Sequence, residues 1–336
     1  MAILGQKGSA TGIPNISFMA STTWTPSCNY EAYVYVIGGG GNASGGYNNP
    51  AISVTGGSAG GCVISKLMLV SGTEYTITVG SGGAAQTMTG HEYRHGNAGG
   101  ASAFSGSGIT TMSAGGGSAG KYWRTGTNGA DYGVADAGGT ATGSNIGCNF
   151  VGGRAGATTA IRQATGGGAV GLWDTGRTPT ETAVGTDDYD SAMGGNLSMY
   201  TRSSQNASNG WTTNDEALPV ALSPFPDLFT WRSDFAYAYL SDTHKMKGQQ
   251  PMYAGLQELG PNSSSDDGLS DSTYNVVTAS PFVGGNGIAT ERATVRTANG
   301  CLGSGSGAFY SEATTSNAIT GAGGDGAVLI FPTSMG

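Results

Sequence analysis

Glycine runs constrain this chain more than any other feature of its sequence. GGGG occupies residues 38–41, and GGG recurs at 115–117 and 166–168. Of the 336 residues, 62 are glycine, which is about two and a half times the usual share of roughly 7%. Glycine loses the most conformational freedom on folding, so an ordered structure needs dense backbone contacts to compensate. No period of three runs through the chain, and this excludes a collagen triple helix.

Packed glycine helices are one way to provide those contacts. A polyproline-II helix makes no internal hydrogen bonds, but such helices of glycine can lie close together and bond backbone to backbone. GGSAGG (56–61) and GGGSAGK (115–121) echo each other as a weak internal repeat, and only 11% of the residues are charged. We therefore predict an all-β chain, a glycine-rich β-sandwich with polyglycine-II-like loops, rather than a helical enzyme.

Strand-forming runs lie near both ends of the chain. The run at 327–331 matches the apolar stretch Tyr33–Ile37, and we predict that the two pair in one sheet. The residues Ser71-Gly72-Thr73 have the composition of a hairpin turn between their flanking strands. Alternation in YTITV places Thr76 and Thr78 on one face. The predicted strands are EAYVYVI (31–37), CVISKLMLV (62–70), YTITV (75–79) and AVLIF (327–331).

Composition changes in the C-terminal half. Residues 203–282 hold only five glycines and many aromatic residues and prolines. We predict an inserted, aromatic-rich subdomain with a conventional core at 203–282. The glycine-rich β domain then consists of residues 1–202 and 283–336, with its N- and C-terminal strands paired.

Charge and cysteine content limit the partners and the compartment. The net charge is −8 and no basic run exists, so we expect no nucleic acid partner. No apolar run is long enough to span a membrane, and we see no secretory signal at the N-terminus, so we expect synthesis in a cytoplasm. The cysteines lie far apart and form no C-x-x-C, which favours buried free thiols over disulfides. They are Cys28, Cys62, Cys148 and Cys301.

Four short motifs follow one another along the chain. They are YVYVIGGGG (33–41), YTITVGSGG (75–83), GGASAF (99–104) and DGAVLIF (325–331). Their order, in which an apolar strand runs into glycines and a G-A-V-x-I strand comes last, resembles the glycine-rich domain of bacteriophage tail proteins. The chain is also similar to the tail-tip adhesins of T-even-like phages, which pack polyglycine-II helices into a rigid sandwich and present variable loops to the host receptor. It departs from them in having fewer long glycine runs and the 203–282 insertion.

The resemblance implies a non-enzymatic virion surface protein made in the host cytoplasm. It would be a phage tail-fibre or tail-tip adhesin that binds a host surface glycan or outer-membrane protein. Its other partners would be copies of itself, in a homo-oligomer, and other virion proteins. The alternative is a purely structural virion component such as a head decoration, head fibre or tail appendage. We expect no cofactor and no membrane insertion. An ice-binding protein would need a flat, regular, threonine-rich face, for which the sequence shows no period.

Aromatic residues set among small polar residues are the candidate receptor contacts. Tyrosine and tryptophan offer rigid amphipathic area and lose little entropy on binding. The alternative is that they cover glycine backbone or lie in a subunit interface. The loops expected to meet the host are 42–56, 86–98, 121–133 and 172–215. The candidates are Tyr47, Tyr93, Tyr122, Trp123, Tyr132, Trp173, Tyr189, Tyr200 and Trp211.

The stretch GHEYRHG (90–96) contains the H-E-x-x-H pattern of zinc metalloproteases. The motif needs a helix that places both histidines on one face, and a third ligand. Glycines flank the stretch on both sides, and the remaining histidine, His244, is distant in sequence. We therefore predict an exposed polar loop, with His91 and His95 as weak candidates for a structural metal site and no catalytic residue.

An acidic cluster offers a second catalytic alternative. Paired carboxylates in GTDDYDS, at Asp187, Asp188 and Asp190, or at Glu216, would suit a virion glycan hydrolase. A solvated loop or a weak calcium site is the favoured interpretation of this cluster.

Overall fold

The protein folds entirely into β structure over the residues that are described. A computed structural model describes 16–47, 52–89, 92–124, 136–156, 158, 163–165, 167–171, 175–176, 178, 190–191, 273–275, 284, 288–290, 294–297, 299–300, 302–311 and 317–335. All 22 regular elements in those ranges are strands, so the predicted all-β class is confirmed. Over the same ranges, no helix is long and apolar enough to cross a membrane.

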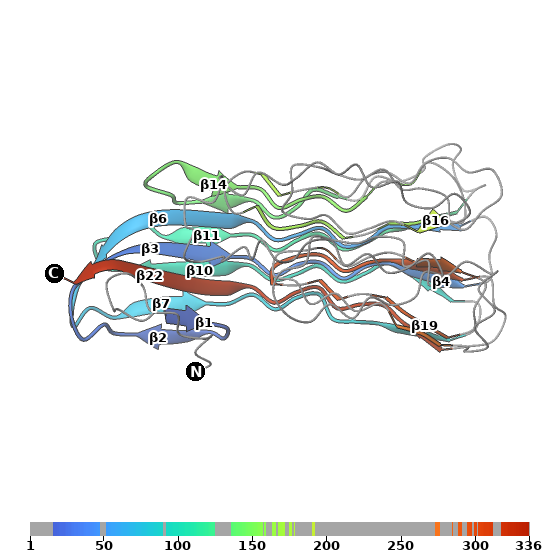
Figure 1. Cartoon of the computed structure of the whole chain (residues 1–336), viewed down its shortest axis with the longest axis horizontal. Coiled ribbons are helices and arrows are strands. Elements are labelled where there is room, and N and C mark those ends of the chain that lie inside the picture. The colour runs from blue at the N-terminus through green and yellow to red at the C-terminus, as the bar shows by residue number, and fades with distance from the viewer. Residues whose placement is uncertain are drawn as a thin grey trace, which may run out of the picture.

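The molecule is elongated, and its two ends differ (Figure 1). The long strands gather at one end, together with the first and last described strands, and we call it the near end. Short strands such as β4 (Gly45–Tyr47) and β19 (Thr294–Arg296) lie at the opposite end, the far end. Extended segments without strand pairing connect the two ends, and we call them the shaft.

Two antiparallel five-stranded sheets form a sandwich at the near end, as predicted. The first sheet has the order β1-β22-β3-β6-β14 and the second has the order β13-β11-β10-β7-β2. The bounds of the first sheet's strands are β1 Ile16–Phe18, β22 Ala327–Met335, β3 Tyr30–Ile37, β6 Cys62–Leu69 and β14 Cys148–Phe150. Those of the second are β13 Ala141–Thr142, β11 Met112–Ala114, β10 Ser102–Gly106, β7 Tyr75–Thr78 and β2 Thr22–Trp24.

The predicted pairing of the two terminal strand regions is confirmed. Strand β22 pairs antiparallel with β3, with Val328 opposite Val36 and Phe331 opposite Tyr33. The strand runs further than predicted, to Met335, past a register shift between Pro332 and Ser334. Proline has no N–H to donate to the ladder, which fits an irregularity at that point.

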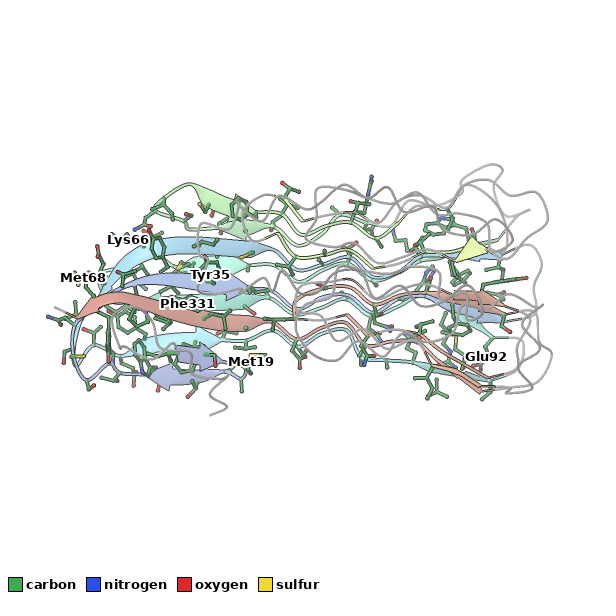
Figure 2. All side chains as sticks on the ribbon, viewed as in Figure 1. Met19, Tyr35, Lys66, Met68, Glu92 and Phe331 are labelled. Atoms are coloured by element: carbon green, nitrogen blue, oxygen red, sulfur yellow. The ribbon has the colours of Figure 1, made fainter. Side chains whose placement is uncertain are left out.

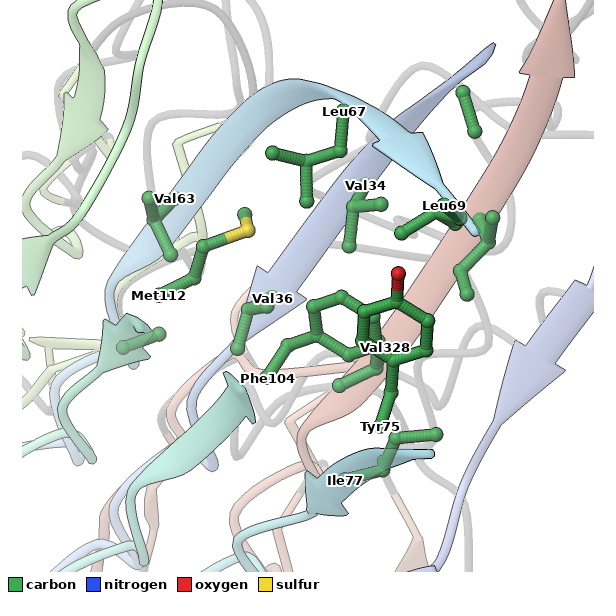
Figure 3. Close-up of a cluster of buried hydrophobic side chains, with 13 residues drawn as sticks. Val34, Val36, Val63, Leu67, Leu69, Tyr75, Ile77, Phe104, Met112 and Val328 are labelled. Atoms are coloured by element: carbon green, nitrogen blue, oxygen red, sulfur yellow. The ribbon is translucent and has the colours of Figure 1, made fainter. Parts of the chain in front are cut away.

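The sandwich core explains the continuous apolar runs in the sequence (Figure 3). Val34 and Val36 face Phe104 and Tyr75 of the second sheet, and all four are buried. Tyr75 and Phe104 stack with ring centroids 5.3 Å apart. The other face of β3 is also covered, since Tyr35 belongs to a second buried cluster. A strand buried on both faces needs apolar residues at successive positions rather than alternation.

The prediction of a hairpin at Ser71-Gly72-Thr73 is wrong in its pairing. The turn forms, with Gly72 at a φ of 75°, but β6 and β7 do not pair with each other. Strand β6 joins the first sheet and β7 the second, so the turn crosses between the layers of the sandwich. The N–H of Gly72 donates to the carbonyl of Pro26 (3.0 Å), which holds the turn away from a hairpin.

Three of the cysteines lie in the described part of the chain, and all three are free thiols, as predicted. Burial is correct for Cys62 alone, because Cys28 and Cys148 are half-buried. Burial raises the pKa of the Cys62 thiol well above its usual value. Cys301 lies outside the described residues.

Glycine segments in the shaft bond to one another with a repeat of three residues. Every third N–H of segment 38–44 donates to the antiparallel segment 55–61. Three residues per turn is the repeat of a polyproline-II-type helix, in which each third residue faces the same neighbour. The bonds are Gly38 N to Gly61 O (2.9 Å), Gly41 N to Ser58 O (2.8 Å) and Ser44 N to Thr55 O (3.0 Å).

Six neighbours surround segment 38–44. Its N–H groups donate to 55–61, 95–100 and 321–326, and its carbonyls accept from 80–86, 115–120 and 302–308. All four N–H groups of the GGGG run and the carbonyls of Gly39, Gly40 and Gly41 are therefore bonded to other segments of the chain. The further bonds are Gly39 N to Gly100 O, Gly40 N to Gly324 O, Gly83 N to Gly40 O, Gly117 N to Gly39 O and Ser306 N to Gly41 O, all between 2.8 and 3.1 Å.

Close approach, not an unusual backbone angle, explains glycine at these positions. A Cβ on Gly40 would fall on the backbone carbonyl of Ser304, and one on Gly41 would fall on that of Ser118. Neither glycine has a φ in the left-handed region. The two echoing segments lie side by side, since Ser58 N donates to Ser118 O (2.9 Å). Their serine hydroxyls make equivalent bonds to Asp136 O (2.6 Å) and Ala137 O (2.7 Å).

Three four-stranded sheets of short strands form the far end, with orders β12-β5-β15-β16, β17-β19-β21-β8 and β18-β20-β4-β9. Strand β17 is the described part of the predicted insertion at 203–282, and it pairs in parallel with β19. The division into a domain and an insertion stays a prediction. The remaining bounds are β5 Ile52–Val54, β8 Thr87–Thr89, β9 Tyr93–Arg94, β12 Tyr122–Arg124, β15 Gln163–Ala164, β16 Asp190–Ser191, β17 Thr273–Asn275, β18 Ile288–Thr290, β20 Phe309–Ser311 and β21 Asn317–Ile319.

Candidate functional site

Two of the predicted receptor contacts meet at the far end. Tyr93 of β9 and Tyr122 of β12 pack with ring centroids 4.7 Å apart and planes inclined by 62°. They come from different excursions of the chain, each of which leaves the near end through one shaft segment and returns through another. Both side chains are half-buried. We call Tyr93, Tyr122 and the adjoining His95 the aromatic cluster.

His95 completes this cluster. Its ring stacks on Tyr122 with centroids 4.3 Å apart and planes 22° apart. The backbone N–H of Tyr122 lies 3.4 Å from the His95 Nδ1, so that nitrogen accepts a long hydrogen bond and is unprotonated. Burial and the Lys121 ammonium both lower the pKa of His95. The ring is therefore neutral around pH 7, because its ordinary pKa of about 6.5 is already below that.

Charged side chains form two ion pairs near the cluster, one beside His95 and one on the opposite face of β9 from Tyr93. Arg94 lies 3.2 Å from Glu92, and Lys121 lies 2.6 Å from Asp136. The four side chains remain 39–55% exposed, and Glu92 marks this end of the molecule in Figure 2. Exposed pairs of this kind contribute little to stability. Their hydrogen-bonding groups remain accessible to a ligand.

A small apolar core holds the cluster from below. Ile52, Val54 and Tyr310 are buried there, and Tyr93 and Tyr122 pack against them. Tyr122 stands opposite Val54 in the pairing of β12 with β5. Tyr93 lies opposite Gly46 in the pairing of β9 with β4. The cluster is thus mounted on paired strands rather than on an isolated loop.

Among the described side chains, Trp123 is a further predicted contact, and it faces away from this cluster. Trp123 is half-buried on β12, directly after Tyr122, so its side chain points to the opposite face of the strand. The backbone of Tyr47 pairs with Ser311. Tyr132, Trp173, Tyr189, Tyr200 and Trp211 lie outside the described residues. All nine stay predictions as receptor contacts.

The H-E-x-x-H pattern does not have the geometry of a zinc site. Tyr93 and Arg94 form strand β9, paired antiparallel with β4, so the helix that the motif requires does not form. His91 lies outside the described residues, and the described ranges contain no group of three potential metal ligands. The acidic candidates Asp187, Asp188 and Glu216 also lie outside them.

The sequence did not predict that His95 stacks on Tyr122, because the H-E-x-x-H pattern suggested a metal ligand instead. The sequence patterns also missed an uncharged face on the second near-end sheet. Its outward side chains are all small and uncharged, and cross-strand register places them in rows: Thr142, Ser113, Ala103 and Thr78 in one, and Ser105, Thr76 and Thr23 in the next. We call these seven residues the hydroxyl face. Only strand pairing reveals it, since its members come from five strands.

Comparison with known protein families gives one match. The model of a glycine-rich domain family matches residues 17–226, which is more than half of the 336 residues. No curated protein matches the chain.

Proposed function

Since this chain belongs to the glycine-rich domain family, we propose that it is a non-enzymatic surface protein of a bacteriophage virion. It acts as a tail-fibre or tail-tip adhesin that binds a receptor on the host surface. Supporting this are the resemblance to phage tail proteins and the arrangement of the described strands.

The position of the aromatic cluster carries the proposal. Tyr93 and Tyr122 lie at the far end, while the first and last described strands, β1 and β22, lie together at the near end (Figure 1). A chain joined to a larger assembly through its terminal regions would present the cluster away from that assembly. Adhesion needs this separation between attachment and recognition.

The shaft supplies stiffness to such a protein. Segment 38–44 bonds to six neighbours, and bending it would break several backbone hydrogen bonds at once, each worth about 1 kcal/mol net. Because the shaft is stiff, binding does not have to order a flexible support, and less conformational entropy is lost. Tyrosines held on paired strands reduce this entropy loss in the same way.

Attachment is assigned to the near end. Its exposed apolar side chains include Met68 (55% exposed) and Val70 (47% exposed), and Figure 2 shows Met68 at the tip opposite Glu92. We propose that other virion proteins, or further copies of this chain, contact this end. The protein is made in the host cytoplasm and ends in the virion.

Binding to intact bacterial cells tests the proposal. Labelled, purified chain is titrated onto a panel of bacterial strains, with an unrelated glycine-rich protein of similar charge as the control. We expect saturable binding to a subset of strains, competed by unlabelled chain. Equal, unsaturable adsorption to every strain would overturn the adhesin proposal.

The hydroxyl face favours a second candidate, a purely structural virion component. An uncharged sheet face of small threonine, serine and alanine side chains allows another subunit to pack closely over it. If this candidate is correct, the parent chain forms an oligomer that light scattering detects and does not bind cells. Thr76→Lys and Ser105→Lys should then convert the oligomer to monomers.

The same rows of hydroxyl side chains would also suit an ice-binding face. Thermal hysteresis in a solution of the monomer would indicate that activity instead.

A further inference from the structure

We infer that the aromatic cluster takes a neutral saccharide rather than an acidic glycan or a protein. The inference rests on the proposed function, because it names the receptor class for the same site. Three features of the far end support it: ring surfaces, the balance of charge, and the absence of apolar anchors among the described residues.

Ring surfaces and hydrogen-bonding groups lie together in the cluster. His95 is exposed and stacks with its inner face on Tyr122, so its outer face is turned away from that ring. Tyr93 adds a second half-buried ring 4.7 Å from Tyr122. A sugar offers an apolar face of C–H groups for such rings and a rim of hydroxyls. Amphipathic aromatic rings with polar tips suit this kind of ligand.

The charged neighbours can bond to hydroxyls from either direction. The carboxylate of Asp136 accepts, and the ammonium of Lys121 donates. These two groups are 2.6 Å apart and are 55% and 39% exposed, so a hydroxyl can bridge them. Arg94 and Glu92 form the same combination, but on the opposite face of β9 from Tyr93. Mixed donors and acceptors match hydroxyl groups, which do both.

The balance of charge argues against an acidic glycan. Among the described residues, Lys121 is paired with Asp136 and Arg94 with Glu92, and His95 is held neutral. The whole chain carries a net charge of −8, which repels a polyanion at low ionic strength. Recognition of phosphate or carboxylate normally uses unpaired arginine or lysine.

Exposed aliphatic side chains, which would add contact area for a protein receptor, are lacking in the described far end. The large rings there, Tyr93 and Tyr122, are half-buried and packed against each other, so they do not project as the anchors of a protein interface do. All the large apolar side chains that the described residues expose belong to the near end or the adjoining part of the shaft: Met19, Met68, Val70, Ile146 and Val151.

Saturation-transfer NMR with defined oligosaccharides tests this inference. The probes are the neutral trisaccharides maltotriose and mannotriose, with 3′-sialyllactose as the acidic comparison, each at about 10 mM because single-site sugar affinities near 1 mM are expected. We expect transfer to at least one neutral sugar, from aromatic protons, and little change when salt is raised. His95→Ala should weaken binding about tenfold, since this exposed side chain can be removed without opening the core. Met68→Ala, at the near end, should leave it unchanged.

Other outcomes separate this inference from the proposed function. Tighter, salt-sensitive binding of the acidic sugar would overturn the saccharide inference. Absence of saturation transfer to both neutral sugars would also overturn it. If the chain binds cells but protease treatment of the cells abolishes that binding, the adhesin proposal stands and the saccharide inference fails. If it binds neutral sugars but no cells, the saccharide inference stands and the adhesin proposal fails.

Discussion

Replacing Gly40 by alanine tests whether the shaft depends on close approach of its segments. The added methyl group would fall on the backbone of Ser304 and Gly305. Those atoms belong to another packed segment and cannot rotate away as the end of a side chain would. The two segments must therefore separate.

The cost in stability follows from the hydrogen bonds that Gly40 loses when it moves away from Ser304. These bonds join Gly40 to two other segments: Gly40 N donates to Gly324 O, and Gly40 O accepts from Gly83 N, both at 2.8 Å. Losing two buried hydrogen bonds costs about 1 kcal/mol each, and overpacking adds about 1–3 kcal/mol. The lower entropy of the unfolded chain returns about 0.4–1 kcal/mol. We expect a net loss of about 2–5 kcal/mol in the free energy of unfolding.

Gly46→Ala is the matched control. A Cβ there would meet only side chains at ordinary contact distance, with the Cβ of Tyr93 at 3.4 Å and Ile52 at 3.5 Å. It should leave stability within about 1 kcal/mol of the parent or raise it slightly. Urea unfolding of both variants, followed by intrinsic fluorescence, measures the difference. If the two variants unfold at the same midpoint, close approach does not explain the glycines.

Three further predictions concern single side chains. Val36→Asp should abolish folding, because it places an unpaired charge in the completely buried sandwich core. A soluble variant with cooperative unfolding would contradict this prediction. A thiol reagent should modify half-buried Cys28 in the native protein and spare Cys62, whose burial raises its pKa; equal rates would show that the core opens. Burial and Lys121 lower the pKa of His95, so its contribution to stability is present above about pH 6.5 and is lost as the pH falls below that value. His95→Asn should therefore flatten the dependence of the free energy of unfolding on pH in that range. An unchanged slope would refute the lowered pKa of His95.

The sequence was informative where burial imposes a pattern. The apolar match between 33–37 and 327–331 was sufficient to predict their pairing, because a strand covered on both faces must be apolar throughout. The glycine runs likewise indicated packed backbone, since nothing else satisfies so many donors and acceptors. The alternation at Thr76 and Thr78 predicted their exposed face correctly.

Pairing between sheets was beyond the sequence. The turn at 71–73 has hairpin composition, yet its flanking strands enter different layers because β6 pairs with β3 and β14. A local turn signal does not say which partner a strand will take. For the same reason neither the aromatic cluster nor the hydroxyl face was foreseen, since both bring together residues from separate excursions.

The orientation of bound protein tests the central claim, that the far end meets the host. Electron cryotomography of the chain bound to outer-membrane vesicles from a strain that it recognises would show which end contacts the surface. We predict that the short-strand end, which carries Tyr93 and Tyr122, touches the vesicle and that the sandwich points away. Contact through the sandwich, or along the side of the shaft, would contradict the account.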